Sequence, residues 1–296
     1  MSPLLPAPLA LVCHDAGAAQ LILPWLPPDA TGVRACLQGP ARALWLERHG
    51  ARAPLVTLEQ ALAGAALLLS GTSLEADLEH LARVQAAAAG LRSVAVIDHW
   101  VHYAARFQRD GLRVLPDELW VCDAEAFALA RAVFPEREVR LQPNLHLRGQ
   151  LQRLAPCPDP LRHPTLLLLA EPQGTVPLDG PAADEQAFDY LIAQSHRLGL
   201  QAPLTLRLRA HDDDPPGRWN AWLERQQGSH DAAPDRAPTL EQALERVAWV
   251  VGLESTALVL AAASGRRAVC AQPPWLPRSR LPQRSLIHLH DLAAPG

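Results

Sequence analysis

The sequence contains no lysine, so all 27 of its basic residues are arginine. This absence excludes enzymes that form a Schiff base on a lysine, and it excludes phosphate-binding loops whose motif requires one. Cysteine is also scarce. The five cysteines lie far apart, and no pair has the C-x-x-C spacing of a zinc or redox site. We therefore expect reduced cysteines and no metal site.

Neither positive nor negative charge is in large excess. The chain has 27 basic and 31 acidic residues, a net charge of −4, and no long run of either sign. Proteins that bind nucleic acid carry a basic patch, so we expect no nucleic-acid partner. No apolar run reaches the roughly 18 residues of a membrane span, and the N-terminus lacks the basic flank of a secretory signal. These features predict a cytoplasmic protein without a transmembrane segment.

Apolar residues are abundant, at 49% of 296 residues, which suffices for one large or two ordinary domains. In the first half of the chain, short apolar runs alternate with helical patterns. The expected strands are 9–13, 32–36, 66–69, 93–97 and 118–121, and the expected helices are 18–26, 41–49, 74–89 and 124–134. This alternation predicts parallel β-α-β units in a doubly wound sheet, whose ligands bind at the carboxyl ends of the strands.

The alternation stops over residues 150–164, a proline-rich segment without periodicity that is typical of a linker. It then resumes. The second set of expected strands is 165–170, 204–208, 248–251 and 267–271, with helices over 183–198 and 257–264. The sequence therefore predicts an α/β protein with two Rossmann-like parallel-sheet domains, residues 1–150 and 160–296.

A candidate phosphate site lies in the second half. The strand that ends at Gly252 is followed by Glu254, and Ser255 and Thr256 then open a helix. Backbone N–H groups, hydroxyls and the positive end of the helix dipole would converge there, which favours a bound phosphate. An ordinary helix N-cap at Ser255 or Thr256 explains the same residues equally well.

A second candidate is the strand that carries Arg209 and ends near His211. Strand alternation places both residues on one side of the chain, with His211 at the carboxyl end. Arginine and histidine both bind phosphate. The alternative is a solvated edge strand whose arginines pair with the acidic run 212–214.

The order of these motifs, from Arg-x-His through Thr-Leu-Glu-Gln-Ala-Leu to Gly-Leu-Glu-Ser-Thr, resembles the C-terminal half of GT-B-type glycosyltransferases. It is especially similar to capsule-type, sialyltransferase-like and polyol-phosphate-transferase-like members, although Asp212 stands where proline usually follows the histidine. The resemblance implies two domains facing a cleft, and it implies that His211, Ser255 and Thr256 hold the phosphate of a nucleotide donor. The other donor-binding candidates are Arg209, Glu254, Gly174 and Thr175.

By the same resemblance, residues 1–150 form the acceptor-side domain. Asp15, directly after the first strand, is the first candidate for the general base that takes the proton from an acceptor hydroxyl, and His14 is the second. Asp15 is at least as well explained as the N-cap of the first helix. Further acceptor-binding candidates follow the third and fourth strands: Thr72, Ser73, Asp98, His99 and Trp100.

Each of these acceptor candidates has a structural alternative. Thr72 and Ser73 suit the capping of a helix that begins at Leu74, and Trp100 suits packing in the core. Asp98 with His99 could instead form an acid/base pair.

Taken together, the residues predict metal-independent transfer of a sugar or sugar-like group from a nucleotide donor to an unknown acceptor, in surface-polysaccharide or glycoconjugate biosynthesis. The nucleotide-sugar is the donor substrate, and no further cofactor is expected. The alternatives are an epimerase or hydrolase of nucleotide-sugars, for which Asp98, His99 and Glu254 would matter more, and a non-catalytic nucleotide-sugar-binding protein.

Overall fold

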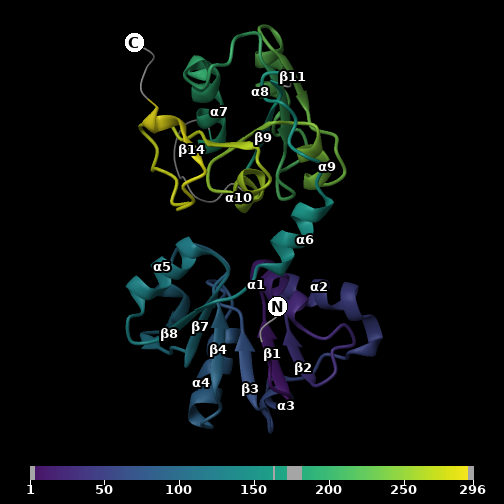
Figure 1. Cartoon of the computed structure of the whole chain (residues 1–296), viewed down its shortest axis with the longest axis vertical. Helices are drawn as coiled ribbons and strands as arrows, with labels where there is room; N and C mark the ends of the chain where they lie inside the picture. The colour runs from purple at the N-terminus through teal and green to yellow at the C-terminus, as the bar shows by residue number, and fades with distance from the viewer. Residues whose placement is uncertain (1–3, 163, 172–181, 293–296) are drawn as a thin grey trace. The chain divides into compact units, whose positions relative to one another are not determined.

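The computed structural model describes residues 4–162, 164–171 and 182–292. The chain divides into two compact units, residues 1–148 and 149–296 (Figure 1). Each unit contains a parallel sheet with six strands among the described residues. This confirms the predicted α/β class with two Rossmann-like sheets.

In unit 1 the strand order is β2-β1-β3-β4-β7-β8, and every neighbouring pair is parallel. The strands are β1 (Leu9–Cys13), β2 (Val33–Leu37), β3 (Leu67–Ser70), β4 (Ser93–Val96), β7 (Glu118–Val121) and β8 (Glu138–Leu141). The four inner strands are buried along their whole length. Strand β8 is mostly exposed at the sheet edge, so no apolar run indicates it in the sequence.

Helices cover both faces of this sheet because successive strand residues point to opposite sides. The helices are α1 (Ala16–Ile22), α2 (Gly39–His49), α3 (Leu58–Leu62), α4 (Leu78–Ala88) and α5 (Ala124–Val133). Leu9 and Leu11 of β1 pack with α1 and α2 on one face. Ala10 and Val12 pack with α3 and α4 on the other. The apolar runs in the sequence therefore reflect burial on both faces.

Short elements complete unit 1. They are the 3₁₀ helices η1 (Leu23–Trp25), η2 (Gly50–Arg52) and η3 (Ala105–Phe107), and the antiparallel pair β5 (Gln108–Arg109) and β6 (Leu112–Arg113). The helix expected over 74–89 begins only at Leu78. The hydroxyl oxygen of Ser73 accepts hydrogen bonds from the backbone N–H groups of Glu75 and Ala76, which forms a turn in place of a first helical turn.

In unit 2 the strand order is β11-β10-β9-β12-β13-β14, again parallel throughout. The strands are β9 (Leu166–Leu169), β10 (Thr205–Arg209), β11 (Asp231–Pro234), β12 (Trp249–Gly252), β13 (Arg267–Cys270) and β14 (Ile287–His288). The helices are α7 (Ala183–Ala193), η4 (Ser195–Leu198), α8 (Asn220–Gln227), α9 (Leu240–Glu245), α10 (Thr256–Ala263) and η5 (Leu289–Asp291). Phe188 and Trp222 pack onto the sheet in the core of this unit.

Helix α6 (Leu145–Arg153) crosses the boundary between the two units. The expectation of an irregular linker over 150–164 is therefore wrong for its first residues, which are helical through Arg153. The side-chain oxygen of Asn144 accepts a hydrogen bond from the backbone N–H of Leu147, and so caps the first turn of this helix. The described residues from 154 to 164 contain no helix or strand.

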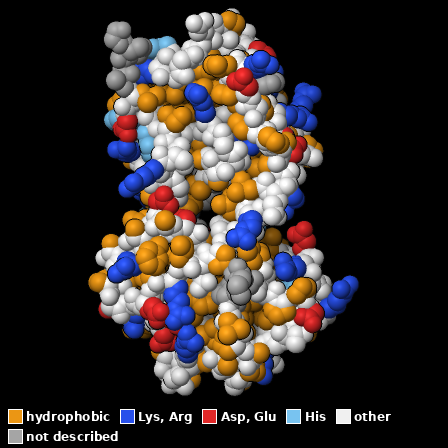
Figure 2. Space-filling model, in the orientation of Figure 1, with side chains coloured by type: hydrophobic (Ala, Val, Ile, Leu, Met, Phe, Trp, Pro, Cys, Tyr) orange, Lys and Arg blue, Asp and Glu red, His pale blue; other side chains and the backbone are white. Residues whose placement is uncertain are grey.

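Basic side chains are scattered over the face drawn in Figure 2, among acidic, apolar and uncharged ones. That face has no continuous basic patch of the kind that binds nucleic acid. Among the described helices, none combines the length and the apolar character needed to cross a membrane.

Candidate functional site

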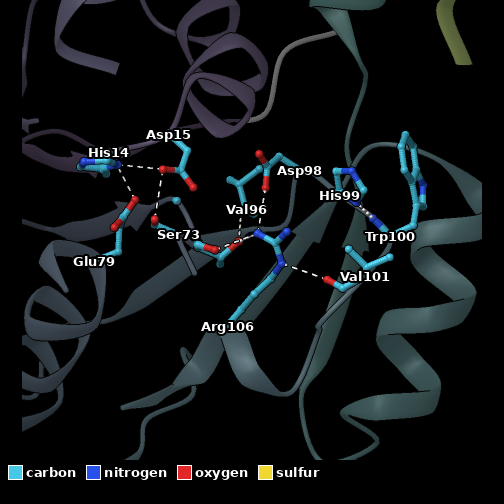
Figure 3. Close-up of polar contacts among 12 residues, drawn as sticks. His14, Asp15, Ser73, Glu79, Val96, Asp98, His99, Trp100, Val101 and Arg106 are labelled. Atoms are coloured by element: carbon cyan, nitrogen blue, oxygen red, sulfur yellow. Dashed lines mark hydrogen bonds and ion pairs between the residues drawn. The ribbon is translucent and has the colours of Figure 1, made fainter. Parts of the chain in front are cut away.

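The loops that follow β1 and β3 meet at the carboxyl edge of the unit 1 sheet (Figure 3). The Nδ1 atom of His14 and the Oδ1 atom of Asp15 are hydrogen-bonded at 2.8 Å. The hydroxyl of Ser73 donates to the same Oδ1 atom at 3.0 Å. The side chains of His14 and Asp15 are 27% and 36% exposed, so solvent reaches both. Three predicted residues from two separate loops thus form one hydrogen-bonded cluster.

Asp15 stands at the N-cap position of α1, yet its side chain makes no capping hydrogen bond with the helix. Its carboxylate instead accepts from Ser73 and contacts His14. The N-cap explanation of Asp15 is therefore not supported by its hydrogen bonds.

The close approach of the His14 ring to α2 requires a glycine. A Cβ on Gly39, where φ is +50°, would lie 2.6 Å from Nε2 of His14.

Two buried charged residues of α4, Glu79 and Arg83, support these loops. The Oε1 atom of Glu79 accepts a hydrogen bond from the backbone N–H of His14 at 2.8 Å. Arg83, one turn further on, donates to the carbonyl oxygens of Gly71 and Arg106 at 3.2 and 3.3 Å. Both side chains are 1% exposed. Burial raises the pKa of the Glu79 carboxyl, and burial lowers the pKa of Arg83 to about 10.

Sequence reasoning missed this pair, although a signal for it exists. Glu79 and Arg83 lie four residues apart, next to Leu78 and Ala82 on the helix face that packs against the sheet. Charged residues beside such a face are seldom fully buried unless they are paired. Their position in the apolar pattern therefore identifies them as candidates for buried charges, which here bind backbone groups of the neighbouring loops.

Asp98, after β4, is held next to Arg106. The Oδ1 atom of Asp98 lies 3.3 Å from Nη1 of Arg106, which also donates to the carbonyl oxygen of Thr72 at 2.8 Å. Burial raises the pKa of Asp98, and the charge of Arg106 opposes this shift. The hydroxyl of Thr72 donates to the carbonyl oxygen of Val96 at 3.2 Å, inside the core. Arg106 therefore connects the loops after β3 and β4.

Trp100 and His99 lie on the same loop, closer to β7. The indole N–H of Trp100 donates to Oδ2 of Asp123 at 2.8 Å, and Oδ1 of Asp123 caps α5 by accepting from Ala126 at 2.6 Å. Nδ1 of His99 accepts from the backbone N–H of Trp100 at 3.0 Å. The Trp100 ring is half-buried and packs against the core beneath α5. Trp100 thus has a structural role, and the residue is still partly accessible to solvent.

In unit 2, three consecutive backbone N–H groups converge at the start of α10. Those of Leu253, Glu254 and Ser255 donate to a single oxygen, Oε1 of Glu171, at 2.9, 2.6 and 2.8 Å. Glu171 follows β9, the strand next to β12. The hydroxyl oxygen of Ser255 caps α10 by accepting from Ala257 at 3.2 Å, and Thr256 is exposed. Backbone N–H groups thus converge where the sequence predicts, and the anion that they bind here is a carboxylate of the chain itself.

Arg209 has partners other than those considered from the sequence, whereas His211 contacts the acidic run 212–214. Nη1 of Arg209 donates to Oδ2 of Asp235 at 2.7 Å and to the carbonyl oxygen of Ala237 at 2.9 Å. Nδ1 of His211 accepts from the backbone N–H of Asp213 at 3.2 Å. The edge-strand alternative is wrong, because β10 lies between β9 and β11 and its arginines pair with residues at or after β11.

The remaining donor-binding candidates are Glu254, Gly174 and Thr175. The carboxylate of Glu254 forms an ion pair with Arg280, whose Nε lies 3.1 Å from both carboxylate oxygens. Gly174 and Thr175 lie outside the described residues. Within the part of the chain that the structure describes, no three His, Cys, Asp or Glu side chains are arranged as metal ligands.

A cavity of about 420 Å³ opens beyond the carboxyl ends of β10 and β11. Asp214, Arg218 and Trp219 line it, together with Asp235. Nη1 of Arg218 donates to Asp214, and its Nη2 binds both carboxylate oxygens of the buried Asp184 at 2.7 and 2.8 Å. Asp214 and Arg218 on this wall are thus already paired with each other.

The fold has counterparts among solved structures. No protein-family model and no curated protein matches the sequence. The co-structure of S. aureus MnaA with UDP matches with a TM-score of 0.56 and 10% identity, over 93% of this chain and 80% of that one. Phytolacca americana UGT2 complexed with UDP-2fluoro-glucose and pterostilbene matches with a TM-score of 0.47 and 10% identity, over 93% and 81%. At this identity the likeness to MnaA concerns the fold alone.

Proposed function

We propose that this protein transfers a sugar or sugar-like group from a nucleotide donor to an acceptor, in the synthesis of a surface polysaccharide or another glycoconjugate. The observation that carries the proposal is the convergence of three backbone N–H groups at the start of α10, at the carboxyl edge of a parallel sheet. Such a group binds the phosphate of a nucleotide well. The fold shared with MnaA, which was solved with UDP, adds support.

In this proposal unit 2 is the donor domain. Ser255 and the backbone around it bind the donor phosphate, with Thr256 at the first position of the helix and His211 on the loop after β10. Arg209 and Glu254 act through their partners Asp235 and Arg280, since ion pairs already engage both. The donor domain is the range 160–296 expected from the sequence, and no metal takes part.

Unit 1 binds the acceptor in the same proposal, within the range 1–150. Asp15 is the general base: its carboxylate is accessible, and contacts with His14 and Ser73 hold its orientation. It takes the proton of an acceptor hydroxyl while that oxygen bonds to the donor carbon. The bond from this carbon to the phosphate oxygen breaks, and the nucleotide leaves with the electron pair.

The other acceptor-side residues differ in what they offer. Trp100 offers part of an aromatic face and His99 a half-buried ring, both of which suit a sugar. Ser73 orients Asp15 through its hydroxyl. Thr72 is buried with its hydroxyl on Val96, and Asp98 is bound by Arg106, so these two position the loops.

One observation favours a second candidate, an epimerase or hydrolase that acts on the donor sugar itself. Burial raises the pKa of Asp98, and a carboxyl that holds its proton longer suits a general acid. A non-catalytic nucleotide-sugar-binding protein would use the same N–H groups and would have no need of Asp15.

Calorimetric titration with UDP, GDP, CMP, CDP and ADP tests the proposal. We expect one of these nucleotides to bind, and we expect Ser255→Ala to weaken its binding about tenfold through loss of a phosphate contact. Thr239→Ala is the matched control, because Thr239 caps α9 of the same unit by accepting from Gln242. Loss of binding in both variants would indicate general damage, and absence of binding by the wild-type chain would contradict the proposal.

Asp15→Asn separates the three functions. In a transferase this variant binds the nucleotide with unchanged affinity and loses turnover with the nucleotide-sugar and acceptor. Turnover of the nucleotide-sugar without any acceptor, lost in Asp98→Asn and kept in Asp15→Asn, would favour the epimerase or hydrolase.

A further inference from the structure

The carboxylate of Glu171 occupies the group of backbone N–H donors to which the proposed function assigns the donor phosphate. Its Oε1 atom accepts from Leu253, Glu254 and Ser255, all within 2.9 Å. Glu171 lies 82 to 84 residues away in the chain and reaches the loop because β9 and β12 are neighbours in the sheet. The donors that would face a phosphate oxygen therefore already share an anionic acceptor.

This contact has the geometry of a bound anion. Each N–H group donates to the same oxygen, as the N–H groups of a helix N-terminus do toward a phosphate. None of the described residues forms an ion pair with the Glu171 side chain, so these three donors, together with the helix dipole, are what holds the charge. A phosphate oxygen and this carboxylate oxygen cannot occupy the same position, and their negative charges repel at short range.

The backbone of Glu171 is anchored independently of its side chain. Its N–H lies 3.4 Å from Oδ2 of Asp184, and its carbonyl oxygen lies 3.4 Å from Nη1 of Arg218. Asp184 and Arg218 are themselves a buried ion pair. The end of β9 can therefore stay in place while the carboxylate leaves the loop.

We infer that the Glu171 side chain is an intramolecular competitor, which a phosphate-bearing ligand must displace from the N–H groups of Leu253, Glu254 and Ser255. The inference rests on the proposed function for the location of the phosphate, and it adds an autoinhibitory contact to that site. Burial also favours displacement of the carboxylate, because it raises the pKa of Glu171, whereas the three hydrogen bonds lower it. The ionised carboxylate is thus bound less favourably there than the hydrogen bonds alone would indicate.

The opposite role, a brace that keeps the loop in shape, makes a prediction of opposite sign. If Glu171 braces the loop, its removal disorders the three N–H groups and weakens anion binding. If Glu171 competes, its removal frees them and strengthens anion binding. The direction of the change therefore decides between the two.

The experiment titrates pyrophosphate and UDP into wild-type protein, Glu171→Gln and Glu171→Ala by calorimetry. Glu224→Gln is the matched control, since it removes one negative charge from an exposed residue of the same unit. We expect both Glu171 variants to bind pyrophosphate about tenfold more tightly or better, as expected when a competing charge-assisted contact is removed, and the control to match wild type. Equal or weaker binding by the Glu171 variants would overturn the inference.

Amide hydrogen exchange supplies a readout that needs no ligand. The N–H groups of Leu253, Glu254 and Ser255 should be protected in wild type and Glu224→Gln, and exchange faster in Glu171→Ala. Fast exchange in wild type would show that the contact is not held in solution and would overturn the inference. If UDP binds wild type and the Glu171 variants equally, only the inference fails, whereas absence of pyrophosphate and UDP binding in every variant contradicts the proposed function as well.

Discussion

Asp98 lies directly against Gly17 of α1. A Cβ atom on Gly17 would be 3.1 Å from Cγ of Asp98 and 2.1 Å from its Oδ2, and the second distance is closer than real side chains approach. The approach brings the carboxylate to the N-terminal end of α1, where a backbone hydrogen bond from Ala18 and the charge of Arg106 oppose the effect of burial on the pKa of Asp98. Gly17 is therefore required by a close contact between two loops at the candidate site.

Gly17→Ala should destabilise unit 1 by about 1 to 3 kcal/mol, because the methyl group forces either α1 or the Asp98 carboxylate to move. Gly149→Ala is the control: Gly149 is also in a helix, α6, and the nearest atom to its Cβ is Nη1 of Arg153 at 3.5 Å. That variant should be unchanged or up to about 1 kcal/mol more stable. Urea unfolding measures both, and equal midpoints for the two variants would count against the close contact.

Arg83→Met should cost about 3 kcal/mol, since it leaves the carbonyl oxygens of Gly71 and Arg106 without these donors and removes the positive charge that lowers the pKa of Glu79. Arg131→Met is the control, because Arg131 is exposed on α5 and lies over the ring of Phe127 at 5.7 Å. It should change stability by less than about 0.5 kcal/mol. Denaturant unfolding provides the comparison.

The double variant Glu79→Gln/Arg83→Met tests whether the two buried charges interact. We expect it to lose less stability than the sum of the single changes, because each charge favours the ionised form of the other. Strict additivity would mean that Glu79 and Arg83 stabilise the fold independently.

The stability of unit 2 should fall in acid partly through Asp214. Burial by itself raises the pKa of this carboxyl, but hydrogen bonds from Trp219 and Arg218 outweigh burial and hold the pKa below its ordinary value. The stabilisation is complete above the pKa of an unfolded aspartate, about 3.9, and is lost as the pH falls through the lower folded value. Thermal midpoints of Asp214→Asn should therefore depend less on pH than those of wild type below about pH 4. Asp212→Asn, which alters an exposed neighbour, should follow the wild-type profile.

Asp123→Ala should destabilise the end of unit 1 that contains α5. It removes the cap of α5 and the acceptor of the Trp100 indole, at a cost of about 1 to 2 kcal/mol. Asp123→Asn keeps a side-chain oxygen and should recover most of the loss. The NMR signal of the Trp100 indole N–H should shift in Asp123→Ala, and an unshifted signal would contradict the contact.

Much of the fold is readable from local pattern. The fully buried strands β1, β4 and β7 were expected within a residue of their observed bounds, because strands covered on both faces appear as continuous apolar runs. Strands β8 and β11 were missed, since both are short edge strands with exposed residues. Neither of these two strands has an apolar run to indicate it.

The candidate site was predictable only in part. His14, Asp15 and Ser73 could be found because polar residues after parallel strands must gather at one edge of the sheet. Their hydrogen bonds could not be found, since these depend on which strands are neighbours. The roles of those residues in catalysis and binding stay predictions.

The sequence by itself determined the α/β fold class of this protein. Burial of strands on two faces and the turn residues between elements are local properties of the chain. Only the tertiary structure decided which charged groups meet. Glu171 and Ser255 are 84 residues apart, and nothing in the letters around either one indicates the other. Their contact arises because β9 pairs with β12 in the sheet, which places the carboxylate where the helix N-terminus collects its N–H donors.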